Sequence, residues 1–453
     1  MTAEPGSLAS GIAALDRILG GGLPSRQVLL VAGQPGSGKT LLASQLAFSH
    51  AARGTPVLLA TAACEPHAKI LDSLEGFSFF KRDRIGRELV LVSVYPWLRK
   101  GVKETRELLL SSVRERKARL LVLDGLRSLR DVWRDETQIR EFLSELGVGI
   151  ATNDCTGIFT LEAAPERVLD LSEAASVDGV VTLGFDAVGM TRVRRLEVLK
   201  LRGRGYLAGR HSAVVGPGGF TLFPRLESLE AAVPVVSWTA DVGRAAFGVP
   251  PLDDYLGGGL PRASVTALFG QSGTGKSLLA AAFAGAGARA GERTLVISLQ
   301  EHADRLRARA MGAGLLRREL PELVLDSPSP LSVDPDAMAH TVLDRAAELL
   351  ARRVVIDGAE RIDAALKPHS RRQDFWIAFA SRLGRGGRDV LLTFSGAPGA
   401  RAGLFRVFSD VLEAWAGDED GQRVLRLRAI KLSTGPVPRK SWRFDLEEAK
   451  GTP

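Results

Sequence analysis

Two short stretches of the chain carry residues whose types and spacing suit the binding of a phosphorylated ligand. The first reads Gly33-Gln-Pro-Gly-Ser-Gly-Lys-Thr40, and the second reads Gly270-Gln-Ser-Gly-Thr-Gly-Lys-Ser277. In this pattern the glycines let several backbone N–H groups converge on a phosphate, and the lysine reaches the outer phosphates. A helix that starts at the pattern adds its positive N-terminal end. The sequence therefore predicts two nucleotide-binding sites, formed by Gly33, Gly36, Ser37, Gly38, Lys39 and Thr40 in the first copy and by Gly270, Gly273, Thr274, Gly275, Lys276 and Ser277 in the second.

A magnesium ion is expected beside each phosphate loop. The hydroxyl groups of Thr40 and Ser277 can ligate Mg²⁺ directly. Asp124 and Asp357 each end an apolar run that reads as a strand, from where a carboxylate can hold a magnesium-bound water. An aspartate at the end of a strand is also a common cap or turn residue. Its position downstream of a phosphate loop makes the metal role the favoured interpretation.

Cleavage of a terminal phosphate also needs a group that orients or deprotonates water. Glu301 follows the apolar run 295–299, whereas Glu65 in the first copy lies one residue later relative to its loop lysine. A shift of one residue on a strand turns a side chain to the other face, unless an extra loop residue near 54–56 compensates. We predict Glu301 as the base of the second copy and Glu65 as that of the first. The alternative is that both are surface acids.

Two threonines, Thr160 and Thr393, end the strand that follows each aspartate. A hydroxyl at that position could sense the γ-phosphate. The alternative is an ordinary β-branched strand residue.

The two loops belong to a sequence unit that occurs twice in the chain. The segments Gly11–Asp16 and Leu19–Pro24 recur as Gly248–Asp253 and Leu256–Pro261, ahead of the second phosphate loop. In both halves, short apolar runs alternate with longer helical stretches, which predicts α/β domains with a mostly parallel sheet. We expect domains at 1–232 and 233–453. The expected strands are Val28–Ala32, Val57–Ala60, Leu120–Leu123, Gly157–Leu161, Val265–Phe269, Leu295–Leu299, Arg353–Ile356 and Val390–Phe394, and the expected helices include Lys39–Ala52 and Lys276–Ala290.

Composition excludes several classes of protein. The 453 residues are 45% hydrophobic and 25% charged, as in ordinary globular proteins, so disorder throughout is excluded. Two cysteines without a CxxC pair exclude a disulfide framework and a four-cysteine zinc site. The chain shows neither a long apolar run nor the pattern of a signal peptide, which predicts a cytoplasmic protein without membrane contact. The net charge of +8 makes nucleic-acid binding possible, but the arginines form no dense cluster, so we do not favour it.

These motifs resemble those of the RecA-fold ATPases, and within them the double-domain KaiC-like proteins. The resemblance extends to Leu196-Glu-Val-Leu-Lys-Leu-Arg-Gly203 and to Gly219–Pro224 at the end of the first copy. It implies two tandem RecA-like P-loop domains, ATP and Mg²⁺ as ligands, and a homo-oligomer, a hexameric ring that holds ATP between neighbouring subunits. Lys200 and Arg202 would then reach a neighbour's γ-phosphate, as Lys431 would in the second copy. There, Ser433 replaces the arginine.

The sequence also departs from the family pattern. The stretch 404–410 lacks the adjacent Ser-Thr pair at which KaiC phosphorylates itself, so an autokinase would need another acceptor, such as Ser409, Ser433 or Thr434. We expect a regulatory ATPase that hydrolyses ATP unequally in its two halves and signals to an unidentified protein partner. The alternatives are a serine/threonine autokinase, a recombinase-like DNA-binding ATPase, and a protein in which the nucleotide mainly holds the ring together.

Overall fold

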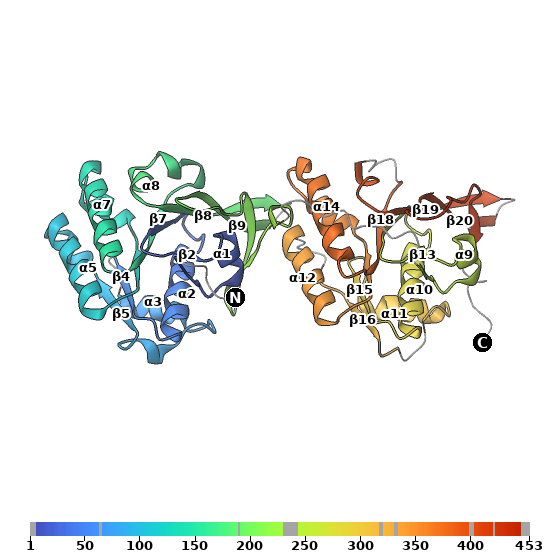
Figure 1. Cartoon of the computed structure of the whole chain (residues 1–453), viewed down its shortest axis with the longest axis horizontal. Helices are drawn as coiled ribbons and strands as arrows, with labels where there is room; N and C mark the ends of the chain where they lie inside the picture. The colour runs from blue at the N-terminus through green and yellow to red at the C-terminus, as the bar shows by residue number, and fades with distance from the viewer. Residues whose placement is uncertain are drawn as a thin grey trace. The chain divides into compact units, whose positions relative to one another are not determined.

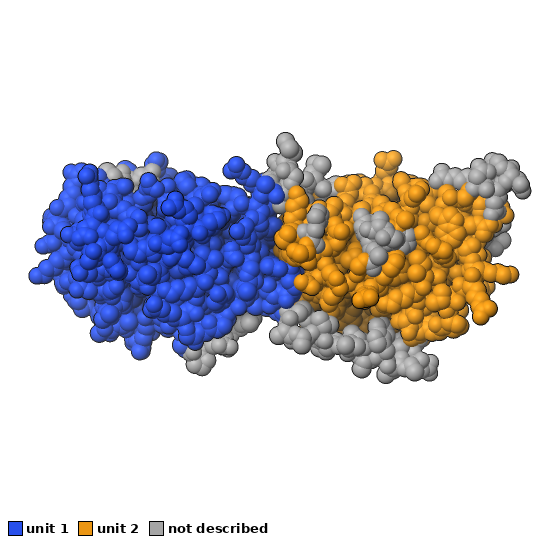
Figure 2. Space-filling view, turned by 90° about the horizontal axis from the view of Figure 1, so that it is seen from above, with its two compact units in different colours: residues 1–229 blue, residues 230–453 orange. Residues whose placement is uncertain are grey.

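The computed structural model describes residues 6–62, 66–188, 191–229, 243–316, 320–329, 334–397, 403–419 and 422–444. The chain divides into two compact units, residues 1–229 and 230–453, which Figure 2 shows in two colours. The division falls close to the boundary expected after residue 232. No helix among the described residues combines the length and the apolar character that a membrane crossing requires.

The first unit is built on one mixed sheet. Its described strands lie in the order β11-β10-β9-β8-β3-β7-β6-β4-β5. Strands β5, β4, β6, β7, β3 and β8 run parallel, and β8 to β11 continue the sheet as antiparallel hairpins. The described elements are β1 (Ser7–Leu8), α1 (Ala13–Ile18), β2 (Leu23–Pro24), β3 (Val28–Gly33), α2 (Lys39–Ala52), β4 (Val57–Thr61), α3 (His67–Leu74), β5 (Leu89–Ser93), α4 (Tyr95–Leu98), α5 (Val102–Arg116), β6 (Leu120–Asp124), α6 (Arg127–Val132), α7 (Glu136–Thr152), β7 (Thr156–Glu162), α8 (Ser172–Ser176), β8 (Gly179–Val188), β9 (Thr191–Leu201), β10 (Arg210–Gly216) and β11 (Gly219–Phe223).

Helices cover both faces of this sheet, as Figure 1 shows. Successive residues of a strand point to opposite faces. Leu29 and Val31 of β3 therefore pack with α2, whereas Leu30 and Ala32 pack with residues of α5 and α7. Because both faces are buried, the central strands read as continuous apolar runs, and this is why the sequence reveals them.

The second unit repeats this architecture. Its described strands lie in the order β16-β15-β17-β18-β14-β19-β20-β21, parallel from β16 to β19 and antiparallel beyond. The described elements are β12 (Arg244–Ala245), α9 (Pro250–Tyr255), β13 (Leu260–Pro261), β14 (Val265–Gly270), α10 (Lys276–Arg289), β15 (Thr294–Ser298), α11 (Ala303–Gly312), β16 (Leu323–Asp326), α12 (Pro335–Glu348), β17 (Arg353–Asp357), α13 (Glu360–Ala365), α14 (Arg372–Gly384), β18 (Asp389–Ser395), β19 (Asp410–Glu419), β20 (Gln422–Lys431) and β21 (Trp442–Phe444).

The expected fold class is confirmed: each unit is a mostly parallel sheet flanked by helices. All eight expected strands are present, with bounds that differ by no more than one residue, and α2 has the expected bounds. The hairpin strands β8 to β11 and β19 to β21 were not expected. Strand β9 carries three arginines and one lysine among its eleven residues, so its apolar signal is weak.

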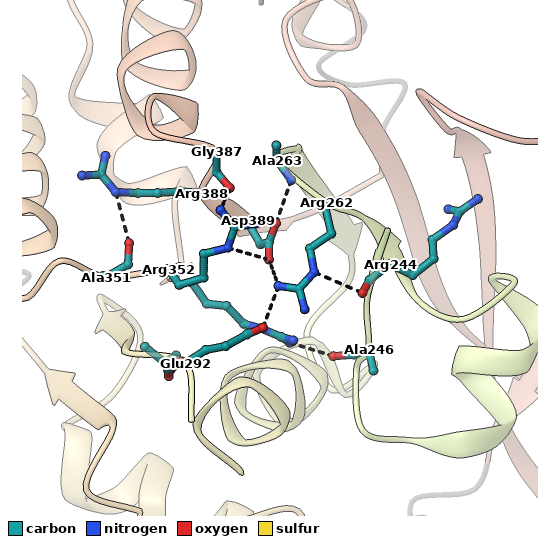
Figure 3. Close-up of polar contacts among 12 residues, drawn as sticks. Arg244, Ala246, Arg262, Ala263, Glu292, Ala351, Arg352, Gly387, Arg388 and Asp389 are labelled. Carbon is teal, nitrogen blue, oxygen red and sulfur yellow. Dashed lines mark hydrogen bonds and ion pairs between the residues drawn. The ribbon is translucent and has the colours of Figure 1, made fainter. Parts of the chain in front are cut away.

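A network of hydrogen bonds and ion pairs lies at the end of the second sheet opposite its phosphate loop (Figure 3). Arg353, only 2% exposed at the start of β17, donates from Nε to Glu292 at 2.5 Å. The Nη1 atom of Arg262 lies 2.7 Å from carboxylate oxygens of both Glu292 and Asp389. The second oxygen of Asp389 accepts from the backbone N–H of Ala263 at 2.7 Å. Arg353 and Asp389 are buried, Arg262 and Glu292 are half-buried, and all four charges are paired with one another. We therefore assign the network to the fold and not to the site.

His50 makes the stability of the first unit depend on pH. Its side chain lies in α2, is 3% exposed, and has an Nε2 atom without a hydrogen-bond partner. Burial, with a smaller effect of Arg53, lowers the pKa of His50 to about 4 from 6.5. The unfolded chain therefore binds a proton between these two values, and the free energy of unfolding falls as the pH drops from 6.5 to 4.

We expect the acid-induced decrease in the free energy of unfolding to be about 3 kcal/mol smaller in His50→Leu than in the wild type. Urea denaturation of the chain at pH 7 and pH 4.5 measures the difference. His302→Gln is the control, because the His302 side chain is 72% exposed. An equal acid-induced loss in the wild type and in His50→Leu would contradict the assignment.

Candidate nucleotide and magnesium sites

In the first unit the phosphate loop joins the end of β3 to the start of α2. Gly36 and Gly38 have φ angles of +74° and +99°, in the region that favours glycine. A Cβ atom at Gly33 would collide with the backbone oxygen of Leu183 and the hydroxyl of Ser37. The loop therefore needs glycine at these positions to keep its curvature.

The second loop has the same construction between β14 and α10. Gly273 and Gly275 have φ angles of +79° and +80°, and a Cβ atom at Gly270 would meet the hydroxyl of Thr274 at 2.7 Å. Both helices begin at the loop lysine, with the last loop glycine as N-cap. Their first N–H groups are therefore directed toward the space above the loop, which suits an anion.

The two loop lysines lie in matching positions. Lys39 Nζ donates to the backbone oxygen of Gln34 at 3.0 Å, and Lys276 Nζ donates to that of Gln271 at 2.7 Å. Burial lowers the pKa of both lysines, while nearby carboxylates oppose the shift. These carboxylates are Glu162 and Asp124 in the first unit and Glu360 and Asp357 in the second.

The structure brings the expected magnesium ligands together in both units. Thr40 Oγ1 donates to the two oxygens of Asp124 at 3.1 and 3.0 Å, and Ser277 Oγ donates to Asp357 Oδ1 at 3.1 Å. Asp357 is 1% exposed, and its Oδ2 atom has no hydrogen-bond partner. A hydroxyl and a carboxylate at this separation are hard oxygen donors, so the residues fit Mg²⁺. When bound, the ion would neutralise charge on the phosphates.

Burial raises the pKa of Asp357, and the charges of Glu360 and Glu301 raise it further. The hydrogen bonds from Thr393 and Ser277 act in the opposite direction. A carboxylate that is both buried and close to other acids costs free energy in its ionised form. A bound cation would offset this cost.

Thr160 and Thr393 both contact the metal-site aspartates. Thr160 Oγ1 donates to Asp124 Oδ1 at 2.5 Å, and Thr393 Oγ1 donates to Asp357 Oδ1 at 2.6 Å. Each hydroxyl also accepts the N–H of the glycine after the aspartate at 2.9 Å. The hydroxyl hydrogen is therefore directed at the aspartate, so each threonine holds the metal-site carboxylate in place, a contact that was not expected from the sequence.

We expect Thr393→Val to weaken Mg²⁺ binding at the second site by about 10- to 100-fold, the usual effect of losing a group that orients a metal ligand. Valine keeps the shape and the strand preference but cannot hold Asp357. Isothermal titration with Mg²⁺ at saturating ATP measures the loss. Thr393→Ser, which keeps the hydroxyl, should retain near-normal affinity, and a defect as large as that of valine would point to packing.

A cavity of about 380 Å³ lies over the second phosphate loop. It is lined by Ser272, Gly273, Gly275, Lys276, Ser277, Gln300, Glu301, Arg305, Arg309, Asp357, Thr393 and Ser395. The expected phosphate, magnesium and base residues of this half therefore meet in one space. Glu301 lies in the turn after β15 with a side chain 12% exposed. Its counterpart Glu65 falls within residues 63–65, outside the described residues.

Sequence reasoning missed several polar residues in this cavity and beside it. Glu360, at the start of α13, accepts from the side-chain amide of Gln300 and from the hydroxyl of Ser395 at 2.8 Å. The first unit differs, because Arg127 there donates to Glu162 at 3.4 Å. Glu360 lies three residues after Asp357, as Arg127 does after Asp124. Closer comparison of the two copies could have revealed this exchange.

The residues expected to act on a neighbouring subunit lie at the ends of β9 and β20. Lys200 Nζ donates to the backbone oxygens of Ala174 and Val177 at 2.9 and 2.7 Å. Lys431 Nζ does the same with Phe405 and Phe408 at 3.3 and 2.7 Å. These lysines are bound within their own units in the isolated chain.

Arg202 is more accessible than the two lysines. Its side chain is 58% exposed, and it lies 3.6 Å from Asp178. At the corresponding place in the second unit, the backbone N–H of Ser433 donates to Asp410 at 2.6 Å. The second unit therefore has no guanidinium at this position.

The alternative phosphate acceptors lie far from the second phosphate loop. Ser409 Oγ accepts from the N–H of Val265 at the start of β14, whereas the loop follows the end of that strand. Ser433 and Thr434 follow Lys431, which pairs with Val411 near the start of β19. A six-residue strand spans roughly 17–20 Å. The second site therefore cannot reach these hydroxyls within its own unit.

Comparison with known proteins agrees with this site. The family described as "ATPase: KaiC" matches residues 8–227 and 245–386. The chain is 28% identical over 322 residues to the circadian clock protein KaiC3 of Synechocystis sp. (strain ATCC 27184 / PCC 6803 / Kazusa), covering 68% of this chain and 62% of that one. It is 27% identical over 379 residues to the circadian clock oscillator protein KaiC of Picosynechococcus sp. (strain ATCC 27264 / PCC 7002 / PR-6), covering 80% and 72%. The chain thus spans less than two thirds of KaiC3. Since the family match covers most of both units, each of which carries a phosphate loop on a RecA-like sheet, the chain belongs to the KaiC family of ATPases.

Proposed function

We propose that this protein binds and hydrolyses Mg·ATP. The observation that carries the proposal is the cavity of the second unit, where Lys276, Ser277, Asp357 and Glu301 line one space. The lysine and the backbone N–H groups would bind the phosphates, and the hydroxyl and the aspartate would hold Mg²⁺. Glu301 would orient or deprotonate the attacking water. Two tandem domains, at 1–232 and 233–453, would each carry one such site.

We further propose that ATP lies between neighbouring subunits of a homo-oligomeric ring of six subunits. Exposure of Arg202 supports this, because a guanidinium supplied across an interface stabilises the charge that develops on the transferred phosphoryl group. The distance of Ser409, Ser433 and Thr434 from the second loop gives no support to phosphorylation within that unit. A regulatory role, in which a protein partner recognises the ring in its nucleotide-dependent form, is the proposed use of hydrolysis.

Two measurements on the purified chain test this proposal. Equilibrium dialysis with Mg·ATP should show uptake that decreases in Lys39→Ala and again in Lys39→Ala/Lys276→Ala. Mass photometry with and without Mg·ATP should show assembly that depends on nucleotide. Absence of uptake by the wild-type chain would overturn the nucleotide function, whereas uptake by a protein that stays monomeric would overturn only the ring.

A further inference from the structure

Two arginines of α11 face the nucleotide cavity of the second unit, and none of the roles assigned above uses them. Arg305 and Arg309 are four residues apart, so they lie on the same face of the helix. Both line the cavity together with Lys276 and Ser277. Arg309 Nη1 lies 2.6 Å from Glu301 Oε1, and Arg305 Nε lies 3.7 Å from Glu301 Oε2.

The charges around this cavity favour an additional cation next to the phosphates. Without the two arginines, Lys276 is the single cationic side chain among its lining residues, against the carboxylates of Glu301 and Asp357. Glu360 adds negative charge next to Asp357. A nucleoside triphosphate is strongly anionic even with one Mg²⁺, so it would enter a space with net negative charge. Arg305 and Arg309 offset that negative charge.

The two halves of the chain carry arginine at different places. Helices α3 and α11 begin after the N-cap residues Pro66 and His302. Counted from these caps, the position of Arg309 is occupied by Ser73 in the first unit. Conversely, the position of Arg202 is occupied by Ser433 in the second unit. Each half therefore has a guanidinium at one of the two positions and a serine at the other.

We propose that Arg309, assisted by Arg305, binds the outermost phosphate of the triphosphate in the second site, from the same chain that supplies the phosphate loop. This inference rests on the proposed function of that site. The planar guanidinium can donate two parallel hydrogen bonds to phosphate oxygens. It substitutes for the cation that Ser433 cannot supply. Because Arg309 pairs with Glu301 in this structure, its transfer to the phosphate also frees a Glu301 oxygen for water.

The experiment uses the intact chain with Lys39→Ala, so that binding and turnover report the second site. In this background, Arg309→Gln should weaken Mg·ATP binding about tenfold or more, the usual effect of losing a charge-assisted hydrogen bond. Binding of Mg·ADP, which lacks the outermost phosphate, should change less than about twofold. Single-turnover hydrolysis by Arg309→Gln should slow at least tenfold. Arg309→Lys should recover part of the loss, because lysine keeps the positive charge but lacks the paired N–H donors of the guanidinium.

Arg307→Gln is the matched control, since Arg307 lies on the same helix but does not line the cavity. It should leave both affinities and the rate unchanged. Three results in Arg309→Gln would each overturn the proposal: equal weakening of ATP and ADP binding, unchanged ATP binding, or faster hydrolysis. Faster hydrolysis would show that Arg309 only restrains Glu301. Failure of the proposed function gives a different result, because Lys276→Ala would then leave Mg·ATP binding unaltered.

Discussion

Replacing Lys276 by alanine is expected to remove most of the ATP hydrolysis of the chain, whereas Lys39→Ala should remove the smaller part. Lys276 lines a cavity in which phosphate, metal and base residues meet. The side chain would neutralise charge that grows on the phosphates in the transition state. Removing such a preorganised donor typically slows a reaction by about 10²–10³-fold.

Phosphate release at saturating Mg·ATP measures this asymmetry, with each lysine variant compared with the wild type and with the double variant. The first unit has its own loop and Asp124, and its smaller share follows from Arg127 in place of Glu360. Lys81→Ala, at an exposed position outside both loops, is a suitable control. Equal losses in the two single variants would contradict the predicted division of labour.

Asp357→Asn is expected to have opposite effects on catalysis and on stability. The amide cannot hold Mg²⁺ as a carboxylate does, so Mg·ATP hydrolysis at the second site should fall by about 100-fold or more. Removal of a group that only supports a metal ligand already costs about 10- to 100-fold. In buffer without nucleotide and metal, the same variant should be more stable than the wild type, because asparagine removes a buried charge.

The sign of the stability effect follows from the pKa. Burial raises the pKa of Asp357 in the folded protein above the ordinary value of 3.8. The folded state then binds more protons than the unfolded state above pH 3.8, so the stability of the wild type decreases as the pH rises through the folded pKa. The advantage of Asp357→Asn should therefore be present at pH 7 and vanish near pH 3.8.

Denaturation midpoints of the chain between pH 4 and pH 8, with and without Mg·ATP, measure both effects. Asp254→Asn in α9 is the control, because Asp254 is exposed and far from the loop in sequence. Mg·ATP should raise the midpoint of the wild type more than that of Asp357→Asn, in which only the first site keeps its carboxylate. A variant that is less stable than the wild type at pH 7 without nucleotide would contradict the argument.

Local sequence was sufficient for the parts of the site that follow one another along the chain. The phosphate loop is a continuous segment whose glycine spacing directly reflects its backbone angles, so both loops could be recognised without a structure. The strands that end in Asp124 and Asp357 are buried on both faces and read as apolar runs. Such strands carry their carboxyl ends to one edge of a sheet, where the loops also lie.

The hairpin strands could not be recognised in the same way. Strand β9 contains three arginines, and one of them, Arg195, is itself buried against Asp186 at 2.9 Å. A charge in a sequence gives no sign that its partner lies on a neighbouring strand. Register across the sheet therefore had to come from the structure.

The sequence by itself determined that the chain contains two phosphate loops with a serine or threonine and a strand-end aspartate, because each is encoded within one segment. Tertiary structure alone decided what those groups touch: Thr160 and Thr393 hold the aspartates, Lys200 and Lys431 bind backbone oxygens, and Arg309 faces the second cavity. The physical reason is that a side chain's role depends on its neighbours in space. Those neighbours come from other strands and helices, at separations that no local pattern specifies.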